Sequence, residues 1–139
     1  MFMWTIYALL AAITAALMTI VGKIGLEKVD PTLATGVRSA FMFLFMFLVI
    51  LIGGKLKGIT TLDRHALLAI IMSAVFGALS WLFYFLALKD GAASRVAAID
   101  RTSVVFIILL SIFFLAEKLT LKVAIGGVLV TIGAILVAL

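Results

Sequence analysis

The sequence contains no cysteine, one proline, one histidine and only six Asp or Glu among its 139 residues. The absence of cysteine excludes disulfides, thiolate metal sites and cysteine nucleophiles. The histidine, His65, stands beside Arg64 in a charged segment, where a solvated loop residue is expected. Because metal-ligand clusters, a Ser–His–Asp set and paired catalytic carboxylates are all missing from the pattern, the sequence predicts neither an enzyme nor a cofactor.

Charge is scarce, because 12% of the residues are charged and 67% are hydrophobic, with a mean hydropathy of +1.44. Soluble domains carry roughly 25% charged residues. The chain therefore has too little polar surface for a water-soluble globule, and the lipid bilayer is its expected surrounding. The net charge of +5 does not predict nucleic-acid binding, because the Lys and Arg residues are scattered from Lys23 to Lys122.

Five hydrophobic segments are separated by charged residues or glycine. A membrane-spanning helix needs about 20 apolar residues, and strands would leave backbone groups unpaired in lipid. The sequence predicts an all-α membrane protein with one domain over residues 1–139. The first segment is expected to be retained, because no Lys or Arg precedes Lys23 as a signal peptide would require. The predicted helices cover about residues 3–22, 32–52, 65–88, 92–116 and 121–139.

Helix starts are indicated at three of the connections. Asp30 is the expected N-cap of the second helix, with Pro31 in its first turn. Thr61 is a candidate cap of the third helix, and the negative charge of Asp63 is favourably placed near the N-terminus of that helix. Thr120 is the expected cap of the fifth helix.

The cations do not favour one orientation in the membrane. Five helices place the termini on opposite sides, and the positive-inside bias is nearly absent. Either the protein has a single orientation, or it inserts both ways and forms an antiparallel homodimer with inverted-repeat symmetry. Lys55, Lys57, Arg64, Lys118 and Lys122 lie on the side of the N-terminus, and Lys23, Lys28, Lys89 and Arg95 lie on the other, with Arg38 and Arg101 deeper.

Asp100 and Arg101 interrupt the fourth hydrophobic segment. Charged groups inside a membrane cost about 2.5–3.5 kcal/mol each on insertion scales. Neighbouring helical residues point about 100° apart, so the expected partners of Asp100 are Arg38 and Lys23 on the same membrane side. The pattern predicts an ion-pair or proton-linked site. The alternatives are a static salt bridge between helices, or an Arg101 side chain that reaches the headgroups.

Two helical faces are candidate linings of a solute cavity. The third helix presents Trp81 and Tyr84, and the first presents Tyr7 and Met18. Aromatic faces can stack on a ligand or attract a cation. The alternative is close packing, since small residues at helical spacing let membrane helices approach each other. The small residues Gly127, Thr131 and others on the fifth helix are assigned to such packing, between subunits or repeats.

The segment from Phe83 to Thr120 resembles the EamA-type domain of the drug/metabolite transporter superfamily, in its single-domain, five-helix bacterial and archaeal subgroup. The turn AEKLT, starting at Ala116, is similar to the family's G-E-[KR]-L-T turn, and Arg38 stands at the arginine of the helix 1–2 connection. Val104 replaces a proline that is common in relatives, so a kink there is not expected from proline.

The resemblance implies a dual-topology or paired transporter in a prokaryotic inner membrane. Its expected partners are the lipid bilayer, a second copy or homologous half, and a small metabolite or drug-like solute, moved by alternating access. If transport is proton-coupled, Asp100 is the only deep carboxylate that can serve it. The alternative function is a non-transporting membrane assembly subunit whose buried charges are structural.

Overall fold

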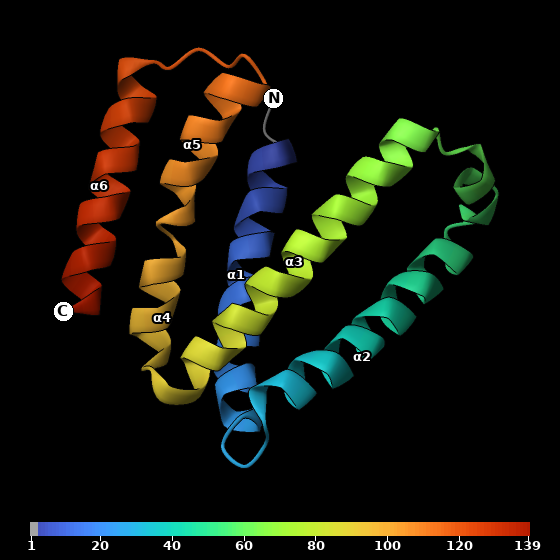
Figure 1. The fold of residues 1–139 in the computed structure, drawn as a ribbon, viewed down its shortest axis with the longest axis horizontal. Helices are drawn as coiled ribbons and strands as arrows, with labels where there is room; N and C mark the ends of the chain where they lie inside the picture. Colours follow the sequence, from blue (N-terminus) through green and yellow to red (C-terminus); the bar gives the residue numbers. More distant parts are fainter. Residues whose placement is uncertain (1–2) are drawn as a thin grey trace. The chain divides into compact units, whose positions relative to one another are not determined.

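The computed structural model describes residues 3–139, and all regular structure in that range is helical (Figure 1). The elements are α1 (Met3–Gly25), α2 (Pro31–Ile52), the 3₁₀ helix η1 (Leu56–Thr61), α3 (Arg64–Asp90), α4 (Ala93–Asp100), α5 (Ser103–Phe114) and α6 (Leu121–Ala138).

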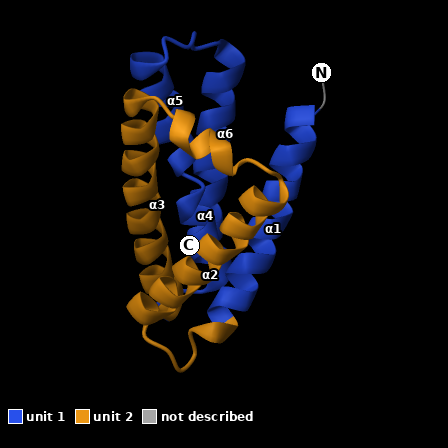
Figure 2. Cartoon of the chain, turned by 90° about the vertical axis from the view of Figure 1, so that its right-hand side faces the viewer, with its two compact units in different colours: residues 1–23, 90–139 blue, residues 24–89 orange. Residues whose placement is uncertain are grey.

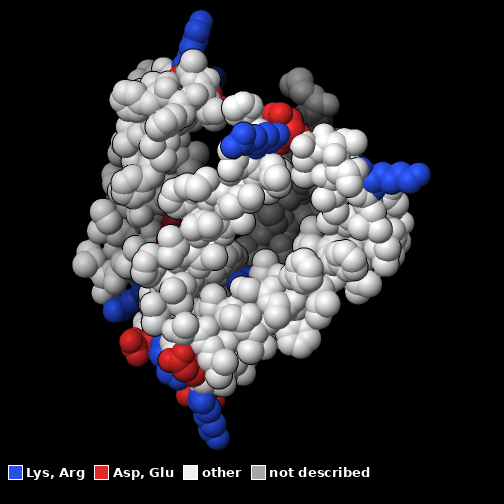
Figure 3. Space-filling view, turned by 45° about the vertical axis from the view of Figure 1, so that its right-hand side comes forward, with Lys and Arg blue, Asp and Glu red and all other residues white. Residues whose placement is uncertain are grey.

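Five helical segments are long and apolar enough to cross a membrane, with α4 and α5 together forming the fourth. On the face shown in Figure 3, most of the surface belongs to residues other than Lys, Arg, Asp and Glu. Large apolar side chains are exposed along every span, as lipid contact requires. The predicted all-α membrane fold is confirmed.

The chain divides into two compact units (Figure 2). We call residues 24–89 the hairpin unit, and residues 1–23 with 90–139 the α4–α6 unit. The single-domain organisation stays a prediction.

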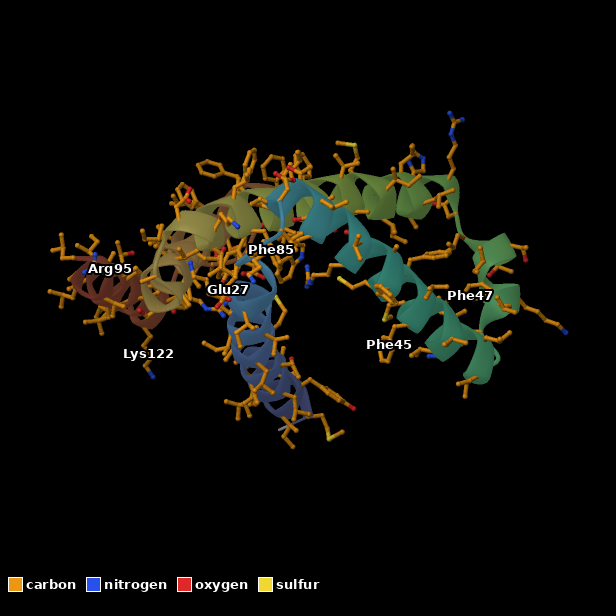
Figure 4. The ribbon with its side chains drawn as sticks, turned by 90° about the horizontal axis from the view of Figure 1, so that it is seen from below. Glu27, Phe45, Phe47, Phe85, Arg95 and Lys122 are labelled. Atoms are coloured by element: carbon orange, nitrogen blue, oxygen red, sulfur yellow. The ribbon has the colours of Figure 1, made fainter. Side chains whose placement is uncertain are left out.

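In the hairpin unit, α2 and α3 run antiparallel, approach each other at the end opposite η1 and diverge toward η1 (Figures 1 and 4). Their closed end is fixed by Lys89. Its ammonium donates to the carbonyl oxygens of Leu26, Glu27 and Val29, the last two at 3.2 Å each. Leu26 and Leu88 are fully buried here, so the connection that precedes α2 is held firmly against the end of α3.

In the α4–α6 unit, α6 packs along both α4 and α5. Gly127 and Ala134 are the buried residues of α6. A Cβ at Gly127 would lie 3.1 Å from Ile108 Cδ1, so glycine permits a close approach to α5. Gly127 and Ala134 therefore pack within the chain. The expected contact of α6 with another subunit or repeat stays a prediction.

The helix starts agree with the sequence in two of three cases. Asp30 Oδ1 accepts from the Thr32 and Leu33 amides at 2.9 and 3.0 Å, and Thr120 Oγ1 accepts from Val123 at 3.3 Å, as predicted. The prediction of Thr61 as the cap of α3 is wrong. Its hydroxyl donates to the Gly58 carbonyl inside η1. Asp63 takes the capping position instead, since its Oδ2 accepts from the His65 amide at 3.2 Å.

Hydroxyl groups inside the spans bond to their own helices. Thr14, Thr19 and Thr35 donate to carbonyls four residues earlier, at 2.8, 2.9 and 2.7 Å. Such bonds give a hydroxyl group a partner on its own helix, which lowers the cost of placing it in an apolar surrounding.

The turn after α5 contains the one non-glycine residue with positive φ among the described residues, Ala116, at 53°. The Leu115 and Glu117 amides both donate to the Ser111 carbonyl, at 2.9 and 3.2 Å, which closes the turn on the end of α5. The family that the sequence resembles has glycine at this position, and glycine adopts left-handed backbone without the steric cost of a Cβ.

We therefore expect Ala116→Gly to stabilise the protein. Left-handed backbone costs a non-glycine residue roughly 1–2 kcal/mol, and the added freedom of the unfolded glycine takes back about 0.5–1 kcal/mol. The melting temperature in detergent should rise by a few degrees. Ala69→Gly is the matched control, because Ala69 is an exposed residue inside α3 with negative φ, where glycine should lower the melting temperature. A melting temperature of Ala116→Gly at or below that of the unmodified protein would contradict the explanation.

Candidate functional site

Asp100 is the last residue of α4, and the fourth span is interrupted directly after it (Figure 1). The sequence led us to expect one helix over residues 92–116. The chain instead makes a tight turn, in which the Thr102 amide donates to Ile99, Val104 to Arg101 and Val105 to Thr102. These bonds reach back three residues, as in a 3₁₀ helix, and such a stretch inside a helix often marks a functional hinge.

The interruption forms without proline. The hydroxyl of Thr102 donates to the Ile99 carbonyl at 2.7 Å, and the Thr102 amide reaches the same carbonyl at 3.0 Å. Thr102 differs from Thr14, Thr19 and Thr35 because both its hydroxyl and its amide bond to the carbonyl three residues earlier, as in a 3₁₀ turn. The Val104 amide donates to the Arg101 carbonyl at 3.2 Å, a bond that a proline at this position could not form. The turn is therefore present with valine at position 104.

The side chains of Asp100 and Arg101 are both exposed on the α4–α6 unit. Among the described residues of that unit, Asp100 has no Lys or Arg nitrogen within 4.0 Å. The ammonium of Lys23 donates to the Gly91 carbonyl at 3.0 Å, and Arg38 belongs to the hairpin unit. The pairing of Asp100 with a cation stays a prediction.

A second group of candidate residues comes together in the hairpin unit. Arg38 Cζ lies 3.8 Å from the centre of the Trp81 ring and 5.3 Å from that of Phe85. Trp81 also meets Tyr84 and Phe85 edge to face, at centroid distances of 5.9 and 6.2 Å. We call Arg38, Trp81, Tyr84 and Phe85 the arginine–aromatic cluster. Tyr84 and Phe85 follow Trp81 by three and four residues, which places the three rings on one face of α3.

A cation held against an aromatic face gains about 0.5–1 kcal/mol when exposed and about 2 kcal/mol when shielded from water. Arg38 is half-buried, so its contact with Trp81 lies between these limits. The cluster lies toward the closed end of the hairpin, where Figure 4 labels Phe85. The sequence named Arg38, Trp81 and Tyr84 but missed Phe85, although its i, i+4 spacing from Trp81 is the signal for it.

The remaining predicted site residues, Tyr7 and Met18, lie on α1. Tyr7 is 63% exposed and Met18 is half-buried. They belong to the α4–α6 unit and the arginine–aromatic cluster to the hairpin unit, so a common site for these residues stays a prediction.

An apolar cavity of about 310 Å³ lies between α5 and α6. Its one polar lining residue is Thr131, whose hydroxyl donates to the Gly127 carbonyl at 2.9 Å. A charged solute would find no partner among these lining side chains. The cavity lining consists of Val105, Ile108, Leu109, Leu119, Ala124, Gly127, Val128, Thr131 and Ile132.

Five apolar spans, lipid-exposed side chains and an interrupted charged span define a multi-pass membrane protein. Residues 2–139 match the model of the EamA-like transporter family. The chain belongs to this family, as the resemblance indicated.

Two relatives match this chain over nearly their whole lengths. An uncharacterized transporter in the cobO 3′ region of a Sinorhizobium species is 32% identical over 135 residues, which cover 97% of this chain and 96% of the relative. An uncharacterized protein of Methanocaldococcus jannaschii is 35% identical over 134 residues, covering 96% and 95%. No solved structure matches the chain significantly.

Proposed function

We propose that the protein is a secondary transporter that moves a small metabolite or drug-like solute across a prokaryotic inner membrane by alternating access. The observation that carries this proposal is the interruption of the fourth span at Asp100 and Arg101. Transporters bind solutes and coupling ions at broken helices, where freed backbone groups and charges line a cavity. Membership of a transporter family supports the same function, and we assign the protein no enzymatic activity.

The working form that we propose is a pair of chains, either two copies or one copy with a homologous half. Asp100 is exposed on its own unit. A charge that faces lipid is costly, about 2.5–3.5 kcal/mol on insertion scales. A second chain would cover this surface and supply the missing half of an inverted repeat. Coupling to protons through Asp100 is part of this proposal.

One observation favours the alternative, an assembly subunit without transport activity. Lys89 and Lys23 both use their ammonium groups to hold backbone carbonyls. Some cations near the spans therefore stabilise connections, and Asp100 would have a similar structural role in such a subunit.

Solute exchange across a liposome membrane tests the transport function. Purified protein is first screened by thermal shift against amino acids, organic carboxylates and quaternary ammonium compounds, because a bound ligand stabilises the folded state by mass action. We expect one class to raise the melting temperature. Liposomes preloaded with that unlabelled compound should then accumulate the labelled form well above protein-free liposomes. A compound that binds but is never exchanged, with protein in either orientation, would favour the assembly subunit.

A further inference from the structure

The guanidinium of Arg38 lies over the aromatic rings of α3. Its Cζ lies 3.8 Å from the Trp81 ring centre, and Phe85 adds a second ring at 5.3 Å. The N–H groups of a guanidinium lie in its plane and point outward from its edges. Contact with ring faces therefore fixes the orientation of the group and leaves its edge donors to meet another partner.

The hairpin unit supplies no counter-charge to this cation. Among residues 24–89, no carboxylate oxygen lies within 4.0 Å of the Arg38 guanidinium, and no hydrogen bond from it is formed. Asp30, the nearest acidic residue along α2, is engaged by the Thr32 and Leu33 amides. An oriented arginine with open edge donors matches the two oxygens of a carboxylate or phosphate group, which it binds through two parallel hydrogen bonds.

We propose that the arginine–aromatic cluster binds an oxyanion, and that the oxyanion is the carboxylate of the transported solute. Arg38 would bind the carboxylate through its edges, and the Trp81 and Phe85 rings would contact the apolar part of the solute. The oxyanion site is inferred from the hairpin unit alone. That the bound solute is also transported rests on the proposed function.

A lipid phosphate offers the same chemistry as a solute carboxylate. Arg38 is seven residues past the start of α2, roughly 10 Å along the helix axis. This depth favours a solute that enters the span over a headgroup that stays at the surface, and the experiment separates the two.

Trp81 is a built-in reporter, because the chain has only two tryptophans, Trp4 and Trp81. In a Trp4→Phe background, purified protein in maltoside detergent is titrated with butyrate, and the fluorescence of Trp81 is recorded. Butyramide is the neutral control of the same shape. We expect a saturable change with butyrate and none with butyramide, because only the carboxylate binds the guanidinium beside the reporter ring.

Substitutions of Arg38 locate the binding. Arg38→Gln should weaken butyrate binding at least tenfold, and Arg38→Lys should weaken it less, since it keeps the charge and loses the planar fork. Arg64→Gln is the matched control, because Arg64 is an exposed cation of the same unit. If Arg38→Gln does not fold, Arg38→Lys and Phe85→Leu carry the test. An equal response to butyramide, or unchanged butyrate binding in every Arg38 variant that folds, overturns the inference.

Phospholipid is then added to the detergent micelles. If phosphatidylglycerol alone produces the Arg38-dependent change and abolishes the butyrate response, the site binds an oxyanion but the solute assignment is overturned. The titration measures binding and does not depend on transport. If butyrate binds but no solute is exchanged in liposomes, the transport function is overturned and the oxyanion site stands. Solute exchange that persists in Arg38→Gln, with no butyrate binding in any variant, overturns the oxyanion site alone.

Discussion

Replacing Asp100 with asparagine is expected to abolish uptake driven by a pH gradient while leaving solute exchange in place. Asparagine keeps the size and hydrogen-bonding capacity of the side chain but cannot bind and release a proton. Asp100 ends α4 at the interruption of the fourth span, where a change of charge can act on the turn that follows. Proteoliposomes with an imposed pH gradient should accumulate the exchanged solute at least tenfold less with Asp100→Asn.

Asp63→Asn is the matched control for this experiment. Asp63 is also an acidic residue at a helix end, but it lies in the connection before α3, outside the spans. Its loss should leave gradient-driven uptake unchanged. Unchanged uptake in Asp100→Asn would remove Asp100 from the coupling mechanism, and a lowered melting temperature without any change in transport would favour the structural role.

Roughly half of the molecules are expected to expose the α2–α3 connection to the outside of the cell. The positive charges on the two membrane sides are nearly equal, five against four with Arg38 and Arg101 left out, and orientation follows their difference. The chain has no cysteine, so a single Ile59→Cys in η1 or Val29→Cys before α2 can be labelled selectively. A membrane-impermeant maleimide should label each variant in intact cells to about half.

A change in loop charge provides the control. Thr60→Lys and Thr61→Lys, added to Ile59→Cys, raise the positive charge of the η1 side by two, and labelling from outside should fall to near zero. In the matching Val29→Cys protein it should rise to near completion. If one site is fully labelled and the other not at all before lysines are added, the protein has a single orientation and the antiparallel pair is wrong.

The spans were predictable because their signal is local and long. Continuous apolar runs of about 20 residues have few other structures available in lipid, and Asp30 and Thr120 cap helices by contacts within three residues. Thr61 failed as a cap for an equally local reason. Its hydroxyl had a nearer carbonyl at Gly58, and Asp63 stood closer to the first turn of α3.

The interruption after Asp100 and the arginine–aromatic cluster depend on information that spacing does not contain. At the turn the hydroxyl and the amide of Thr102 both bond to the Ile99 carbonyl, and no proline in the sequence marks this position. The contact between Arg38 and Trp81 requires the register of α2 against α3, which two uniformly apolar helices leave open. The small residues of α6 fit contacts within one chain or between two equally well by spacing alone.

The three carbonyls that converge on Lys89 have a mechanical consequence. They join the 26–29 connection to the end of α3, so the hairpin can pivot only weakly where its helices meet. The displacement of α2 relative to α3 is then smallest beside Lys89 and increases along both helices toward η1. Arg38 lies toward this fixed end, so its contact with the Trp81 and Phe85 rings would be kept while the η1 end of the hairpin moves.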